Sequence, residues 1–195
     1  MLRKTQRDRT AFPWARCVNE LTSWLRFKSV MKKITTLLFL ISSAAFADGS
    51  LTPDIRISSE LLGYDLQYRV YIPEGADSGD DLSVLFVTDG PEYIRQGRMP
   101  RVLDRMIGSG KMEPIVAVFV DARDPDSLRK SRRNSQFLCN KDYLSFYESE
   151  LIPDIEQNYP VGGSRGYRGI LGLSYGGTHA ACGGLLGSRT VSRSG

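Results

Sequence analysis

Two short apolar runs constrain the fold of this chain more than any other feature of its sequence. Residues 82–87 (Leu-Ser-Val-Leu-Phe-Val) and residues 115–120 (Ile-Val-Ala-Val-Phe-Val) are rich in valine and carry no charge. Strands of this kind are typical of sheets that are covered on both faces, because neither face meets water. Between the two runs, Pro100 can open a helix that ends near Gly108. One face of this helix would present the apolar residues Val102, Leu103, Met106 and Ile107.

Other segments extend this alternation of strands and helices. Residues 66–72 alternate apolar and polar side chains and stop at Pro73, which predicts a half-exposed strand. Residues 167–171 predict a short strand, and glycines and a helix-like stretch follow it. Strands that are separated by helices predict an α/β fold with a mostly parallel sheet and helices on both faces.

A second helix is expected over residues 141–157. Asn140 can cap its first turn, and Pro153 should kink it. Its apolar stripe would consist of Leu144, Leu151, Ile152 and Ile155. The polar segment 121–140 before it is expected to be a long loop at the edge of the sheet, and loops of this length in compact domains are often functional.

The N-terminal region has the three parts of a secretory signal. From Met31, two lysines precede an apolar run at 34–41, and the small-residue triplet Ala45-Phe46-Ala47 follows. We therefore expect residues 31–47 to be a signal peptide, and the protein to be periplasmic or secreted. The run is too short for a transmembrane helix, so none is expected in the mature form. A buried core helix is the alternative for this segment.

Residues 1–30 precede a methionine that already begins a complete signal. We expect them to be an extension from a mis-assigned start codon, although a genuine extended signal would look the same. Residues 48–187 are expected to form one domain, because they contain no repeat, low-complexity tract or linker. Residues 188–195 lack apolar periodicity and are expected to be an irregular tail.

Charge is distributed unevenly along the chain. The net charge is +4, but residues 1–33 hold nine of the 26 basic residues and two of the 22 acidic ones, which leaves −3 on residues 34–195. The domain therefore offers no basic groove for phosphates, and we expect no nucleic-acid partner. The sequence has one histidine, no Cys-x-x-Cys and no glycine-rich phosphate loop, so we expect neither a metal nor another cofactor.

Two cysteines, Cys139 and Cys182, follow the signal segment. An exported chain meets an oxidising compartment, where two thiols permit one disulfide. Nothing in the sequence places these two within bonding distance, so we expect free, buried cysteines.

The strongest chemical signal is Gly172-Leu173-Ser174-Tyr175-Gly176, which lies between a predicted strand and a predicted helix. In a nucleophile elbow, the serine sits on a sharp turn that leaves no room for bulk two residues before and after it. Ser174 is the expected nucleophile, which would attack an acyl carbonyl and form an acyl-enzyme. The backbone N–H of Tyr175 would stabilise the oxyanion. A simple glycine-rich turn is the alternative.

A second oxyanion donor should come from the loop after residues 82–87. Pro91 has no N–H, which leaves the backbone N–H of Gly90 or of Glu92. An ordinary turn at this position is the competing interpretation.

The motifs of this chain together resemble a known family. They are Val-Thr-Asp-Gly at 87–90, Val-Phe-Val-Asp-Ala at 118–122, Arg133 with Cys139-Asn140, Glu-Leu-Ile-Pro at 150–153, and Gly-Leu-Ser-Tyr-Gly-Gly at 172–177. In this order they are similar to the enterochelin (enterobactin) esterases and to the wider esterase D family, which includes mycolyltransferases. The resemblance covers residues 66–186.

This resemblance implies an α/β-hydrolase fold and hydrolysis of small-molecule esters, in a siderophore trilactone or its iron complex. It also implies that Arg133 lies near the site and contacts substrate. The family's acidic residue in that stretch is Gln136 here. A solvated loop is the alternative for the basic cluster at 129–133.

A serine hydrolase of this fold orders its triad as Ser, acid, His, yet no acidic residue follows Ser174. The single histidine, His179, lies five positions later on the same predicted helix, so we expect a packed or solvent-facing residue and not the general base. The chain ends where the family continues, so we expect a C-terminal truncation and weak or no activity. A non-catalytic exported remnant or binding module, or an acyltransferase, is the alternative. The oligomeric state is not predicted.

Overall fold

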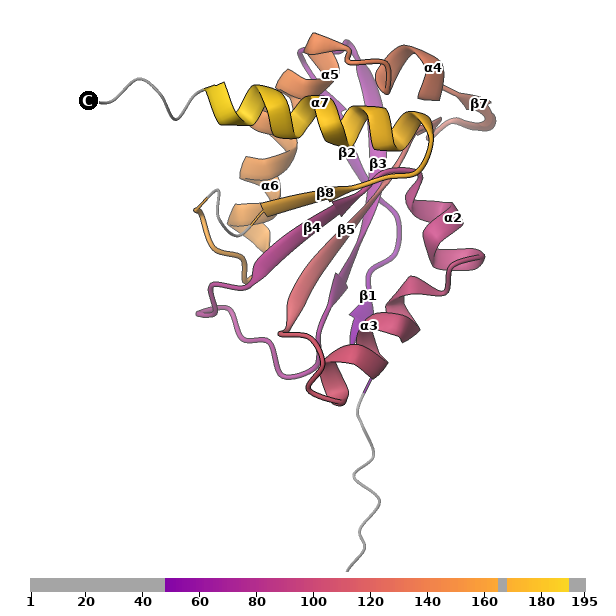
Figure 1. Ribbon diagram of the computed structural model, residues 1–195. Helices are drawn as coiled ribbons and strands as arrows, with labels where there is room; N and C mark the ends of the chain where they lie inside the picture. Colours follow the sequence, from indigo (N-terminus) through magenta and orange to yellow (C-terminus); the bar gives the residue numbers. More distant parts are fainter. Residues whose placement is uncertain (1–47, 165–167, 190–195) are drawn as a thin grey trace, which may run out of the picture. The chain divides into compact units, whose positions relative to one another are not determined.

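The computed structural model describes residues 48–164 and 168–189, with side chains up to residue 184. The expected extension 1–30, the signal segment 31–47, Tyr167 and residues 190–195 lie outside this part. A mixed sheet has the strand order β1-β3-β5-β4-β8, and β2 also pairs with β3 (Figure 1). Its strands are β1 (Ser50–Leu51), β2 (Ile55–Ser59), β3 (Tyr64–Ile72), β4 (Ser83–Val87), β5 (Ile115–Asp121) and β8 (Arg168–Leu171).

The direction of the strands differs between the two halves of this sheet. Strand β4 is parallel to β5 and to β8, as predicted. Strand β3 is antiparallel to β1, β2 and β5, so the prediction of a mostly parallel sheet is wrong for this half. The short turn over residues 60–63 between β2 and β3 permits only an antiparallel pair, whereas helices provide the long crossovers that parallel strands need.

Strand β3 is also more buried than its alternating sequence predicted. Leu66 and Tyr68 are 1% and 3% exposed, and Val70 and Tyr71 are 0% and 1% exposed. Strands pair with both edges of β3, and the side chains of its two faces enter two different hydrophobic clusters. Both faces of β3 are therefore buried, and each contributes a tyrosine to its cluster, Tyr68 on one face and Tyr71 on the other.

Helices cover both faces of the sheet, as predicted. Helices α2 (Gly90–Arg95) and α3 (Met99–Gly108) pack on the face that presents Val87, Ala117 and Phe119. The opposite face packs against α5 (Lys141–Phe146), the π-helix η1 (Tyr147–Leu151) and α6 (Ile152–Asn158). This face presents Val84, Phe86, Val116, Val118 and Val120. Successive side chains along β4 and β5 point to opposite faces of the sheet, so the two strands contribute to both hydrophobic clusters.

The helix that begins near Pro100 buries a narrower face than its sequence predicted. Leu103 is 2% exposed, and Met99 and Ile107, one turn away on each side, pack with it. Val102 is 45% exposed, so its assignment to the buried face is wrong. It lies about 100° around the helix from Leu103, beyond the ridge that Met99, Leu103 and Ile107 form.

The cap expected for the helix over 141–157 is confirmed, and a π-helical turn interrupts the helix where Pro153 was expected to kink it. The side chain of Asn140 accepts a hydrogen bond of 3.0 Å from the backbone N–H of Tyr143. The helix widens into the π-helical turn η1, where the N–H of Ile152 donates to the carbonyl of Tyr147. Pro153 follows immediately, and its missing N–H explains why the regular hydrogen-bond ladder is broken at this point.

The segment 121–140 is structured and is not the loop that its polarity predicted. It contains the hairpin of β6 (Arg123–Asp124) and β7 (Ser127–Ser131), followed by α4 (Arg133–Gln136). Asp124 holds the hairpin through an ion pair of 2.8 Å with Arg132, whose N–H donates to the carbonyl of Ala122. Charged groups stabilise this hairpin, so apolar periodicity could not reveal it.

Helix α7 (Tyr175–Arg189) includes the first two residues of the segment that was expected to be irregular. Among the residues that the structure describes, no helix is both long and apolar enough to cross a membrane.

Candidate active site

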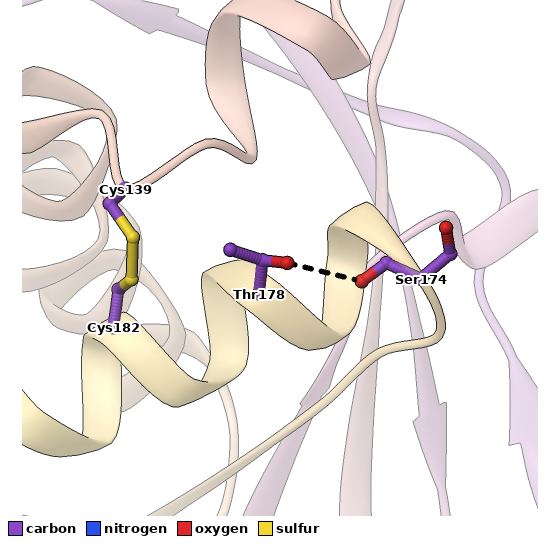
Figure 2. The surroundings of a disulfide bond; sticks show 4 residues. All are labelled: Cys139, Ser174, Thr178 and Cys182. Atoms are coloured by element: carbon purple, nitrogen blue, oxygen red, sulfur yellow. Dashed lines mark hydrogen bonds between the residues drawn. A yellow bond between two sulfur atoms is a disulfide. The ribbon is translucent and has the colours of Figure 1, made fainter.

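Ser174 occupies a sharp turn between β8 and α7. Its φ angle is 57°, in the left-handed region that residues other than glycine rarely adopt. The N–H of Thr178 donates to the carbonyl of Ser174 at 3.0 Å, which begins the helix, while the serine side chain remains exposed. Figure 2 shows the hydroxyl of Ser174 pointing away from Thr178 and the body of α7. The strand–turn–helix setting predicted for Ser174 is confirmed.

The glycines of the motif are required by close backbone approach. A Cβ on Gly172 would lie 2.3 Å from the carbonyl carbon of Gly176. A Cβ on Gly176 would lie 2.2 Å from the Oγ1 of Thr88, which is fully buried at the end of β4. The turn therefore closes only because both positions lack a side chain, as the sequence motif predicted.

A cavity of about 460 Å³ opens beside Ser174. Five segments that are distant in the sequence line it: the β4–α2 corner, the end of β5, the β6–β7 hairpin, α4 and the elbow. Its lining residues are Asp89, Pro91, Glu92, Tyr93, Asp121, Ala122, Arg123, Leu128, Arg129, Ser131, Arg133, Leu173 and Ser174. The elbow thus opens into a pocket whose lining combines charged side chains with apolar surface.

Arg133 lines this pocket together with Ser174. Its Nε is 2.6 Å from Oδ1 of Asp89, and its guanidinium lies 6.0 Å from the centre of the Tyr175 ring. The side chain is 38% exposed, so part of the guanidinium remains free to meet a ligand. Its contact with substrate stays a prediction.

Asp89 is a site residue that the sequence interpretation missed. It stands at the N-cap of α2 with a φ of 54°, but its carboxylate pairs with Arg133 and makes no capping hydrogen bond. Burial raises the pKa of this carboxyl, and Arg133 opposes that shift. The Asp89-Gly90 pair one residue after a buried strand was the available signal, because such pairs mark sharp turns.

A second ion pair, between Asp121 and Arg123, also lines the pocket. Arg123 donates from Nε and Nη2 to Asp121 at 2.8 Å and 2.7 Å. Asp121 also accepts a hydrogen bond of 2.8 Å from Gln67 and is 4% exposed, so this wall is fixed by buried contacts.

The two candidates for the second oxyanion donor differ in their surroundings. The N–H of Glu92 donates to the carbonyl of Asp89 at 2.9 Å and is therefore engaged. Gly90 is buried, and a Cβ there would lie 2.5 Å from the carbonyl carbon of Phe119. The N–H groups of Gly90 and Tyr175 stay the predicted donors.

His179 is a packed helix residue, as expected. It is 0% exposed, and the ring centres of Phe137, Tyr143 and Tyr147 lie 5.7, 5.0 and 4.9 Å from its own. Burial lowers its pKa to about 4. Neither ring nitrogen has a hydrogen-bond partner within the described residues. This aromatic enclosure keeps the imidazole from acting as a base for Ser174.

Gln136 takes no part in the pocket. It is 1% exposed and donates a hydrogen bond of 3.2 Å to the hydroxyl of Tyr64. The side chain of Gln136 therefore serves the interior of this domain.

Cys139 and Cys182 form a disulfide with a Cα–Cα distance of 5.6 Å (Figure 2). The expectation of free, buried cysteines is wrong. Cys139 is exposed in the turn between α4 and α5, with a φ of 53°, and this turn brings it to α7. The two residues are 43 positions apart, and only the folded crossover brings them together.

Comparison with known proteins places the chain in a family. Residues 59–186 match the protein family described as "Putative esterase". The chain belongs to this esterase family. An iron(III) enterobactin esterase from Yersinia enterocolitica is 24% identical over 118 residues, which are 60% of this chain and 32% of that protein. The chain therefore spans about a third of the length of this relative.

Solved structures of esterases share the fold. The enterochelin esterase of Shigella flexneri superposes with a TM-score of 0.60 and 21% identity, over 72% of this chain and 33% of that one. A ferulic acid esterase superposes with a TM-score of 0.59 and 25% identity, over 69% and 54%. The predicted α/β-hydrolase fold and the resemblance to enterobactin esterases are thereby confirmed.

Proposed function

We propose that the chain is a serine-dependent carboxylic ester hydrolase, with Ser174 as its nucleophile. The left-handed conformation of Ser174 between β8 and α7 carries this proposal, because it exposes the hydroxyl at the mouth of the pocket. The Ser174 oxygen would bond to the acyl carbon and displace the alcohol, and water would then release the acid. The N–H groups of Tyr175 and Gly90 would stabilise the oxyanion in each step.

The proton of Ser174 needs an acceptor, and His179 is enclosed by aromatic rings. We therefore expect the 195-residue polypeptide alone to hydrolyse esters slowly. Loss of triad function lowers turnover by about a millionfold in a well-studied serine protease.

The substrate we propose is a siderophore-type ester, similar to enterochelin. The mouth of the pocket combines apolar surface with positive charge: Leu128 and Leu173 are 51% and 75% exposed, and Arg129 makes no ion pair within the described part of the chain. Such a mouth suits an aromatic acyl group that carries negative charge. Relatives of this fold were solved with enterobactin and with 2,3-dihydroxy-N-benzoyl-serine.

We also propose that the protein is exported. The signal pattern of residues 31–47 and the disulfide between Cys139 and Cys182 support an oxidising compartment. Recovery of the protein only from the cytosol, with residues 31–47 intact, would contradict export.

The function is tested by supplying an external proton acceptor. Purified protein would be incubated with a p-nitrophenyl ester and increasing imidazole, beside Ser174→Ala as the matched control. The proposal predicts an imidazole-dependent rate that exceeds the rate of the control, and an acyl adduct on Ser174 detected by mass spectrometry. Equal rates without an adduct favour the binding module, and product transfer to an added sugar in place of water favours the acyltransferase.

A further inference from the structure

Two anchors fix α7, the helix that begins directly after Ser174. One is the enclosure of His179 by Phe137, Tyr143 and Tyr147. The other is the disulfide between Cys182 and Cys139 (Figure 2). Cys182 lies eight residues after Ser174, about two helical turns along α7. Both anchors tie the helix to the segment of α4 and α5.

Helix α7 is poorly suited to form without such anchors. Five of its fifteen residues are glycines, the weakest helix formers after proline. At Gly183 the close approach of Ile170 explains the glycine, because a Cβ would lie 2.9 Å from its Cδ1. Gly184 is exposed, and a Cβ there would meet nothing within 4 Å, so no contact requires it. The helix therefore depends on contacts with the rest of the fold.

The disulfide also connects the two sides of the pocket. Helix α4 begins with Arg133, which lines the cavity, and Cys139 follows three residues after the helix ends. On the other side, Ser174 and Cys182 belong to one continuous turn and helix. The disulfide thus joins α7, which follows Ser174, to the turn after α4, which begins with Arg133.

We propose that Cys139 and Cys182 are positioning residues, whose disulfide holds α7 helical and keeps Ser174 in reach of the pocket. The inference rests on the proposed role of Ser174. Cys139 is exposed, so a soluble dithiol can reach the bridge. Dithiothreitol would form its own cyclic disulfide while Cys139 and Cys182 each gain a proton and become thiols.

The first test measures how fast a fluorophosphonate labels Ser174, with imidazole present. Oxidised protein, protein reduced with dithiothreitol, and Cys139→Ser/Cys182→Ser would be compared, and hydrogen exchange of residues 178–184 would be followed in parallel. We expect at least a fivefold slower labelling and faster exchange in α7 when the bridge is absent. Unchanged labelling and unchanged exchange would overturn the proposal.

The second test restores the helix without the bridge. Gly184→Ala in the Cys139→Ser/Cys182→Ser background should recover labelling by up to about fivefold, the equivalent of about 1 kcal/mol of helix stability. Gly79→Ala is the matched control. A Cβ on Gly79 also meets nothing within 4 Å, but Gly79 lies outside α7, so its substitution does not strengthen this helix. Equal effects of the two substitutions would contradict the positioning role.

Failure of the proposed function gives a different result. If Ser174→Ala is labelled as fast as the oxidised wild type, Ser174 is not the nucleophile. The exchange of α7 would then still report whether the bridge holds the helix.

Discussion

Substitution of Gly176 tests whether the elbow closes through backbone approach. In Gly176→Ala, the new Cβ would lie 2.2 Å from Oγ1 and 3.2 Å from Cβ of Thr88. Thr88 is 0% exposed, and its Oγ1 already lies 3.3 Å from the carbonyl of Leu171, so it has little room to move. Overpacking costs about 1–3 kcal/mol, and the better helix propensity of alanine returns up to about 1 kcal/mol. Because a Cβ–Oγ1 distance of 2.2 Å is far below an ordinary contact, the overpacking cost falls at the upper end of this range, and we expect a net loss of about 2 kcal/mol.

Urea unfolding followed by circular dichroism measures this loss. With a slope of about 2 kcal/mol per molar urea, the midpoint should fall by about 1 M. Gly177→Ala is the matched control, since it makes the same change one residue later and its Cβ would lie 3.2 Å from the carbonyl oxygen of Gly172. Its midpoint should stay close to that of the wild type.

Thr88→Ala removes the atom that the new Cβ would meet. In the double variant Thr88→Ala/Gly176→Ala, we therefore expect a loss smaller than the sum of the two single losses by about 1 kcal/mol or more. Additive losses, or identical midpoints for Gly176→Ala and Gly177→Ala, would refute the packing explanation of the motif.

The remaining predictions concern the buried ionisable groups. The pKa of His179 is about 4 in the folded protein and about 6.5 in the unfolded chain. As the pH drops from 6.5 to 4, the unfolded chain binds a proton that the folded protein does not, so the free energy of unfolding falls by about 3 kcal/mol. His179→Phe should lose this part of the pH dependence of the unfolding free energy, measured by urea titrations, and should retain fluorophosphonate labelling of Ser174. If the unfolding free energy of the variant depends on pH as in the wild type, the burial of His179 is contradicted. Arg133→Met leaves the carboxylate of Asp89, whose side chain is 14% exposed, without its partner and should cost about 1–3 kcal/mol. Asp89→Asn in the Arg133→Met background removes the unpaired charge and should recover most of this loss. A further loss of stability would show that the cost of Arg133→Met does not come from the unpaired carboxylate of Asp89.

The core strands could be predicted because burial on both faces leaves a direct trace in the sequence. The runs of β4 and β5 are apolar apart from Ser83 and Asp121 at their ends, and the elbow follows from glycines at fixed positions around Ser174. The partners and directions of the strands could not be predicted in the same way. The alternation in β3 is compatible with either direction, and the short turn after β2 decides the pairing.

The parts of the site that the sequence did not reveal depend on contacts between distant segments. Asp89 and Arg133 are joined across the pocket by an ion pair that no local pattern encodes. The same holds for the disulfide, whose two cysteines meet only after the crossover has folded. The hairpin of β6 and β7 was missed because Asp124 and its ion pairs hold it, without an apolar face.

The central claim is that Ser174 is a nucleophile with a preformed oxyanion site, and a crystal structure of the fluorophosphonate adduct tests it most directly. The account predicts phosphorus bonded to the Oγ of Ser174, with the phosphonyl oxygen about 2.7–3.1 Å from the backbone nitrogens of Tyr175 and Gly90. Phosphorus on another residue, or a phosphonyl oxygen that meets neither nitrogen, would contradict it.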